Sequence, residues 1–269
     1  MPTAPLNGHA MYYELHGPVD APRALVMGGW GTWCHGDAGG LPRGLTDRYR
    51  VVIFDHRGIG ESNDDAAIPA SMTLYAADVA ALLDHLGWRN VHIVGLVGMG
   101  ACIGQELAIA RPDLVRSLIN SGAWAKPDPY FVDQMNMLLS LHRDLSFWRF
   151  QQETVQLSFD REFYNDNRSR LLGPEGGWKE LRGNVGAHAR FTQAVNTHDA
   201  LDRLTLIKAP SLVIHAGRDM ITPPPLSLPI ERGIPGAQGL HVDAAGHVFA
   251  GREMKKILAD AVMGFVAAH

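Results

Sequence analysis

Residues 91–108 read VHIVGLVGMGACIGQELA, and they indicate the fold more clearly than any other stretch of the chain. The apolar run Val91–Val97 predicts a buried strand. Met99–Arg111 predicts a helix, which ends before Pro112 because proline cannot continue a helix. Strand and helix meet through glycines, so the chain is expected to turn sharply between them.

The same alternation of strand and helix runs through most of the chain. Helical spacing of apolar residues predicts two further helices, Leu74–Leu86 and Met254–Ala267. Further strands are expected at Ala10–Leu15, Ala24–Met27, Arg50–Phe54, Val115–Asn120, Ser211–Ala216 and Gly239–Val242. Such alternation is typical of an α/β protein. We therefore predict a doubly wound, mostly parallel sheet of about eight strands with helices on both faces.

One region interrupts this rhythm. From Lys126 to Thr205 the sequence offers no convincing buried strand and is rich in large aromatic side chains. We expect a helical cap over the carboxyl edge of the sheet, with most of these aromatics packed in its own core and a few facing the cleft beneath. The predicted domains are a core formed by residues 1–125 and 206–269 and a cap formed by residues 126–205.

Composition limits the class of protein. The chain has 269 residues and a formal net charge of −4, so it offers no basic surface for nucleic acid or an acidic membrane. No signal-like leader or bilayer-length apolar run is visible. Cys34 and Cys102 have neither metal-ligand spacing nor a disulfide framework. We expect a cytoplasmic protein with a small-molecule substrate, no nucleic-acid or membrane partner, no metal and no cofactor; a homodimer is compatible with the sequence.

Four motifs, in this order along the chain, resemble those of the α/β-hydrolase family. Leu25–Gly31 resembles the oxyanion-loop strand, with Gly28-Gly29 where members commonly have His-Gly. Asp55–Ser62 resembles the D-x-R-G-x-G-x-S turn. Ala209–Asp219 resembles the strand and turn that deliver the acid, and Ala245–His247 the turn that delivers the histidine. The resemblance covers nearly the whole chain and is nearest to the enol-lactonase and aminoacrylate-hydrolase branch.

This resemblance makes residues 91–108 an elbow without a nucleophile. In the G-x-S-x-G motif the strand-to-helix turn lifts a catalytic serine. Counting back from Gln105–Ala108 puts the serine position on Gly98, or on Val97 if Gly98 is an inserted residue. Neither side chain can attack a carbonyl. The missing side chain is expected to leave room for a water or a substrate atom, and the helix N-terminus at Met99 favours an anion there.

The resemblance also implies the rest of the site. His247 would be the base, and Asp219 would accept its Nδ1–H and fix its tautomer. Trp30 and Met99 would supply the backbone N–H donors of an oxyanion hole. The residues expected to contact the substrate are Gly29, Val97, Trp124 and Val248.

Other candidate residues have weaker claims. Cys102 stands in a G-x-C-x-G pattern, but it falls a full turn inside the helix and is expected to pack in the core. The glycines around Met99 follow a middle strand, whereas a dinucleotide-binding loop follows the first. His56, His215 and His241 lie on or beside strands and are expected to be structural.

We expect the His247–Asp219 pair to hydrolyse a small activated carbonyl compound such as an enol-lactone, a carbamate or a β-keto compound. A site that lacks one triad member still accelerates its reaction by about 10³–10⁴-fold over water. The sequence leaves three alternatives open. They are a cofactor-free lyase, decarboxylase or isomerase, a non-catalytic small-molecule receptor, and an esterase whose serine was replaced by glycine to trap a substrate.

Overall fold

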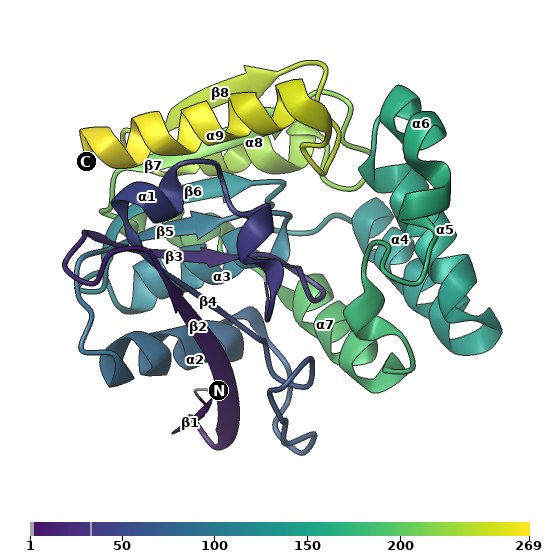
Figure 1. Cartoon of the computed structure of the whole chain (residues 1–269), viewed down its shortest axis with the longest axis horizontal. Helices are drawn as coiled ribbons and strands as arrows, with labels where there is room; N and C mark the ends of the chain where they lie inside the picture. Colours follow the sequence, from purple (N-terminus) through teal and green to yellow (C-terminus); the bar gives the residue numbers. More distant parts are fainter. Residues whose placement is uncertain (1–2, 33) are drawn as a thin grey trace.

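The computed structural model describes residues 3–32 and 34–269, which fold around one eight-stranded sheet. Its strands are β1 (Thr3–Leu6), β2 (His9–His16), β3 (Arg23–Met27), β4 (Arg50–Phe54), β5 (Val91–Gly95), β6 (Val115–Ser121), β7 (Ser211–Ala216) and β8 (Gln238–Val242). They lie in the order β1-β2-β4-β3-β5-β6-β7-β8 (Figure 1). β2 is antiparallel to β1 and β4, and the other neighbouring pairs are parallel. The predicted mostly parallel sheet is therefore confirmed.

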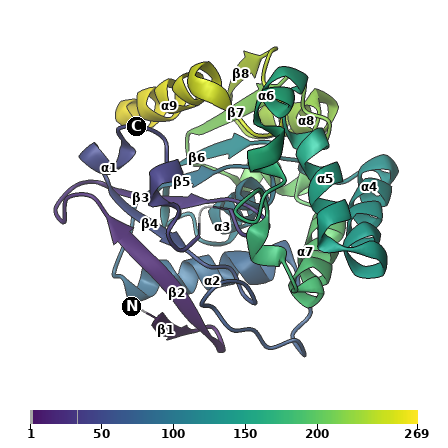
Figure 2. The same ribbon diagram turned by 45° about the vertical axis from the view of Figure 1, so that its right-hand side comes forward.

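Helices cover both faces of this sheet (Figures 1 and 2). On one face Leu25 and Met27 of β3 share a buried cluster with residues of α2 (Met72–His85), α3 (Met99–Ala110) and α8 (Pro224–Gly233). On the other face Ala24 and Val26 of β3 share a cluster with residues of α1 (Leu45–Arg48) and α9 (Gly251–Ala268). Because side chains alternate along a strand, burial of both sets requires a helical layer on each side.

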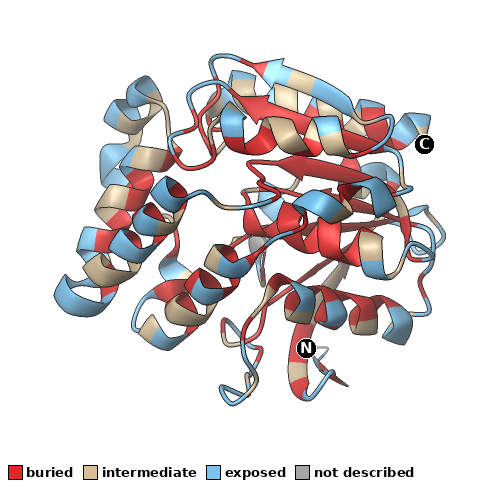
Figure 3. Ribbon diagram, turned by 180° about the vertical axis from the view of Figure 1, so that it is seen from behind, coloured by how far each residue is buried: buried red, intermediate tan, exposed pale blue. Residues whose placement is uncertain are grey.

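Burial on both faces explains why the sequence located the central strands. Every residue of β5 and of β7 is buried, so each strand appears in the sequence as an almost continuous apolar run. Figure 3 shows these strands as a buried layer between helices whose outer faces are exposed. The edge strand β1 and the helices α1 and α8 were not predicted. α8 begins with Pro224 and Pro225 and contains Pro229, and these prolines hide its helical character.

The segment between β6 and β7 is helical. It contains α4 (Pro129–Ser140), a π-helical turn (Leu141–Leu145), α5 (Phe147–Ser158), α6 (Arg161–Leu171) and α7 (Val185–Thr197). Two 3₁₀ turns, Lys179–Leu181 and Leu201–Leu206, complete it, and the described residues include no strand between β6 and β7. The caps of α4, α5, α6 and α7 are Asp128, Ser146, Asp160 and Asn184, whose side chains accept backbone N–H groups at the helix starts. We call α4–α7 the insertion helices; they lie beside one end of the sheet (Figure 2).

A partly buried ion pair connects the end of this segment to the core: the Glu106 side chain is buried, and that of Arg203 is 39% exposed. The Glu106 carboxylate on α3 accepts hydrogen bonds from Arg203 at 2.6 and 2.8 Å. Burial alone would raise the pKa of Glu106, but His198 and Arg203 lower it to about 2.

Among the described helices, none is both long and apolar enough to cross a membrane.

Candidate active site

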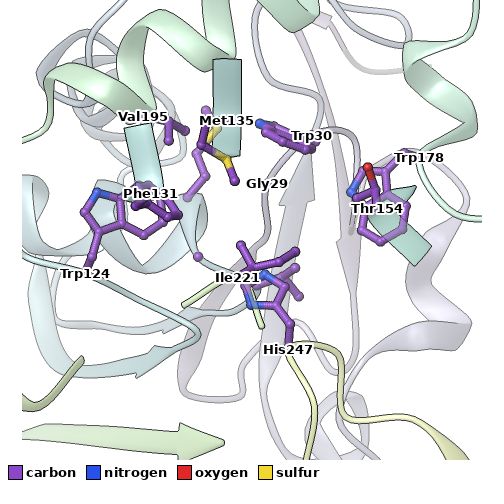
Figure 4. A pocket seen from close by; sticks show the side chains of 13 residues that line it. Gly29, Trp30, Trp124, Phe131, Met135, Thr154, Trp178, Val195, Ile221 and His247 are labelled. Carbon is purple, nitrogen blue, oxygen red and sulfur yellow. The ribbon is translucent and has the colours of Figure 1, made fainter. Parts of the chain in front are cut away.

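A pocket lies between the carboxyl ends of the strands and the insertion helices. It encloses about 390 Å³ of empty space, part of it open to solvent. Figure 4 shows Trp30, Trp124 and Trp178 arranged around the space in front of His247. The lining residues are Gly29, Trp30, Val97, Gly98, Met99, Trp124, Phe131, Met135, Thr154, Trp178, Val195, Ile221 and His247.

The elbow itself is a tight turn that holds two residues at positive φ. Val97 has φ 51°, and Gly98 has φ 74° and ψ −87°. α3 begins at the next residue, Met99, as the sequence predicted. A β-carbon built on Gly98 would lie 3.7 Å from Cε1 of His247. A side chain at Gly98, one of the two positions that the sequence left open for the missing nucleophile, would thus face the histidine; Val97, the other, also lines the pocket.

The space in front of Gly98 is smaller than the sequence led us to expect. A β-carbon at position 98 would lie only 3.0 Å from Cζ3 of Trp124 and 3.1 Å from the Gly122 carbonyl oxygen. The edge of the indole ring therefore takes up part of the room that a serine side chain would use. Gly122 is itself restricted, since its own β-carbon would lie 2.9 Å from Cε1 of His247.

His247 and Asp219 form a buried hydrogen-bonded pair. Nδ1 of His247 lies 2.8 Å from Oδ2 of Asp219, so the ring donates this proton to the carboxylate. Asp219 also accepts hydrogen bonds from the Thr222 hydroxyl at 2.8 Å and from the backbone N–H groups of Ile221 and Thr222 at 2.8 and 2.7 Å. Burial alone would raise the pKa of Asp219, but the charge and hydrogen bond of His247, with those from Thr222, lower it. The aspartate thus stays ionised and orients the imidazole.

The expected oxyanion donors flank the pocket, but one already has a partner. The backbone N–H of Met99 donates to the Val97 carbonyl oxygen at 3.0 Å, so it is not fully free to bind a substrate oxygen. Trp30 adopts φ 52° in the opposite loop, directly after Gly29. A β-carbon on Gly29 would lie 2.8 Å from Cβ of Met99, so glycine is needed for the two loops to approach.

His56, which was expected to be structural, supports this loop through a contact that the sequence did not predict. His56 is buried, and its Nε2 lies 2.9 Å from the Gly28 carbonyl oxygen, which requires Nε2 to carry a proton and donate it. Burial lowers the pKa of His56 and keeps the ring neutral. The side chain thus braces the Gly28-Gly29 loop, where the family's usual histidine is absent. Its position in the Asp55–Ser62 turn was the available signal.

Two residues considered from the sequence lie outside the pocket lining. Val248 does not line it, although its backbone N–H donates to the Ser158 carbonyl oxygen at 2.9 Å. Cys102 is fully buried, its thiol lies 3.3 Å from the Trp124 carbonyl oxygen, and burial raises its pKa, so it is not a nucleophile. The expected Gly29, Val97 and Trp124 do line the pocket, as do Phe131 and Trp178 from the aromatic-rich segment.

The chemistry of the lining constrains the ligand. Among the described residues that form the pocket, His247 is the only ionisable one, and none is Lys, Arg, Asp or Glu. Thr154 has its hydroxyl occupied by a 2.8 Å hydrogen bond to the Phe150 carbonyl oxygen. The pocket therefore combines one positioned base with walls that are otherwise almost entirely apolar.

Comparison with known sequences agrees with this architecture. The family described as "alpha/beta hydrolase fold" matches residues 25–250. A protein of Azorhizobium caulinodans named "Putative carbamate hydrolase RutD" is 29% identical over 263 residues, covering 93% of this chain and 92% of that protein. Its namesake from Stutzerimonas stutzeri is 28% identical and covers 88% of this chain and 89% of its own.

Solved structures share the fold over almost the full length. MGS-M2, an alpha/beta hydrolase enzyme from a Medee basin deep-sea metagenome library, has a TM-score of 0.87 at 21% identity, covering 99% of this chain and 97% of its own. The enol-lactonase from Burkholderia xenovorans LB400 has a TM-score of 0.83 at 21% identity, covering 99% of this chain and 100% of its own.

Proposed function

The chain belongs to the α/β-hydrolase fold family, and on that premise we propose that it hydrolyses a small, uncharged, activated carbonyl compound without a serine nucleophile. The observation that carries this proposal is the His247–Asp219 pair, held at 2.8 Å in front of Gly98. A binding protein has no need of an oriented acid–base pair. The names of the carbamate-hydrolase relatives favour a carbamate among the candidate substrates.

In the proposed mechanism His247 acts on water. Nδ1 is engaged by Asp219, so Nε2 is the nitrogen that takes the proton while the water oxygen bonds to the carbonyl carbon. The resulting oxyanion is stabilised by two backbone N–H groups, those of Trp30 and Met99. The Met99 N–H would divide its hydrogen bond between this oxyanion and the Val97 carbonyl oxygen. The C–N or C–O bond then breaks, and the imidazolium returns its proton to the leaving group.

The apolar walls define the preferred substrate. A permanently charged group would lose its hydration in this pocket without gaining an oppositely charged side chain from Lys, Arg, Asp or Glu among the described lining residues, which is costly. The insertion helices supply Phe131, Met135, Thr154 and Val195 to the lining, and in this proposal they act as the cap that excludes water from all but the attacking position.

The test is a substrate panel. Neutral carbamates, enol-lactones and β-keto esters, each with an anionic analogue, are incubated with the protein and with two variants, His247→Ala and the exposed control His85→Ala. We expect turnover of neutral members by the wild type and by His85→Ala, and its loss in His247→Ala. Binding of neutral compounds without turnover would instead support the receptor, and release of CO₂ from a β-keto acid without hydrolysis would support a lyase.

A further inference from the structure

Two histidines lie side by side at the edge of the sheet, outside the pocket lining. His215 of β7 and His241 of β8 are register partners on neighbouring parallel strands. Their rings stack, with centroids 4.4 Å apart and an interplanar angle of 19°. His215 is buried, whereas the His241 side chain is 55% exposed, so the pair is reachable from solvent.

Helix α8 brings a carboxylate to this pair. Oε2 of Glu231 lies 2.7 Å from Nε2 of His215 and 3.9 Å from Nε2 of His241. One ligand atom from each of the three residues lies within 4.8 Å of the other two. A side chain at Gly239 of β8 would collide with the Glu231 carboxylate, so this glycine leaves the space that the carboxylate occupies.

The contacts of His215 favour a ligating ring. Oγ of Ser227 lies 2.7 Å from Nδ1 of His215 and 3.4 Å from the Pro224 carbonyl oxygen. A carboxylate can only accept, so without a metal Nε2 of His215 donates to Glu231 and Nδ1 accepts the Ser227 O–H. A metal ion would take the place of the Nε2 proton, and Ser227 would then turn its O–H to Pro224 and accept Nδ1–H. Metal-bound histidines are held in this way by an acceptor on the second nitrogen.

From this geometry we propose that His215, Glu231 and His241 bind a divalent transition-metal ion, with zinc as the probe. Two imidazoles and a carboxylate are a donor set suited to such ions, and water would complete the coordination. Zinc holds its ligands at about 2.0–2.2 Å in a tetrahedral arrangement, which places the ligand atoms roughly 3.4 Å apart. The exposed His241 ring must therefore turn inward, and the Glu231 carboxylate must move slightly away from His215. From the sequence no metal was expected and His215 and His241 were taken to be structural, because the three ligands come from separate elements.

The proposed ion would act as a clamp. It would join the edge strand β8 and helix α8 to β7. Asp219 follows β7 and His247 follows β8, so the clamp would hold the two loops that carry the catalytic pair. The ion would stabilise the fold without touching the substrate, and it is independent of the function proposed above.

Zinc chloride alone is the probe in the test. Protein treated with chelator and then freed of it is titrated with zinc by calorimetry, and its Tm is measured with and without zinc. Four proteins are compared: the wild type, His241→Ala, Glu231→Gln, and the control His16→Ala, which removes a histidine 2.9 Å from Glu14 on β2. At a hundredfold excess over Kd, zinc should raise the Tm of the wild type and the control by about 5–10 °C.

Each result of this titration decides the proposal. His241→Ala and Glu231→Gln should each weaken zinc binding at least tenfold, while circular dichroism without zinc shows both folded. Cobalt(II) bound to the wild type should give visible absorption that these two variants lack. The proposal is overturned if the wild type binds no zinc, or if the two variants bind it as tightly as His16→Ala.

Discussion

Gly98→Ser tests whether the geometry of the elbow disfavours a side chain at position 98. Its cost in stability follows from the backbone angles and from the neighbouring atoms. The φ of 74° at Gly98 is strained for any residue with a side chain and costs about 1–2 kcal/mol. The new β-carbon would also press on Trp124 and on the Gly122 carbonyl oxygen, at 3.0 and 3.1 Å. Such overpacking costs about 1–3 kcal/mol. Gly98→Ser should therefore lower the free energy of unfolding by about 2–5 kcal/mol, the sum of these contributions.

A matched control separates the two contributions. Gly87 has a similar φ of 65°, but a β-carbon there would have no atom within 4 Å. Gly87→Ser should consequently lose only the backbone part, about 1–2 kcal/mol. Urea denaturation measures the free energy of unfolding of each variant. The difference between the two serines is the cost of crowding at position 98.

A double-mutant cycle identifies the crowding side chain. In a Trp124→Leu background, Gly98→Ser should be less destabilising by about 1–2 kcal/mol, part of the crowding cost, because the indole edge is gone while the Gly122 carbonyl oxygen remains. The double variant should also gain a burst of product with an aryl ester, as expected for an acyl-enzyme. If the two substitutions are additive within about 0.5 kcal/mol, Trp124 does not restrict this position and the explanation is wrong.

Substitutions at three further residues test other parts of the molecule. Asp219→Asn should lower kcat by about 10²–10⁴-fold, no more than His247→Ala, with little change in KM, because His247 adopts the wrong tautomer; a loss under tenfold in steady-state kinetics would contradict this role. His56→Phe should leave the Gly28 carbonyl oxygen without its hydrogen-bond donor and lower kcat about tenfold. His56→Gln retains an N–H donor and should lower kcat less. Equal kcat in both variants would show that the hydrogen bond to Gly28 does not support the loop. The folded-state pKa of Glu106, about 2, lies below its unfolded value near ~4.3, so on the order of 3 kcal/mol of stability is present above about pH 5 and lost as pH falls toward 2. Unfolding of Glu106→Gln should show a flatter pH dependence in that window, and an unchanged slope would refute the ion pair's contribution.

The parts of the fold that the sequence predicted are those with a clear local pattern of apolar residues or glycines. The central strands are buried on both faces, so their apolar runs were visible, and α3 begins at Met99 as expected. β1 is a four-residue edge strand that alternates exposed and buried residues, and it gave no comparable signal.

In the candidate active site, too, some features could be predicted from the sequence and others could not. Motif order pointed to Asp219 and His247, which the structure brings within 2.8 Å. The approach of Trp124 to Gly98 was not predictable, because it depends on how the turn after β6 packs against the turn after β5. The bond between the Met99 N–H and the Val97 carbonyl oxygen arises from backbone angles that the residue types do not specify.

The most direct test of His247 as the catalytic base is chemical rescue of His247→Ala by imidazole. On a substrate identified from the panel, His247→Ala should lose about 10²–10⁴-fold in kcat/KM, and added imidazole should restore part of it with saturation, because the ring would re-enter the space beside Asp219. Imidazole should not rescue Asp219→Asn. A His247→Ala protein that keeps wild-type kcat/KM without imidazole would contradict catalysis by His247.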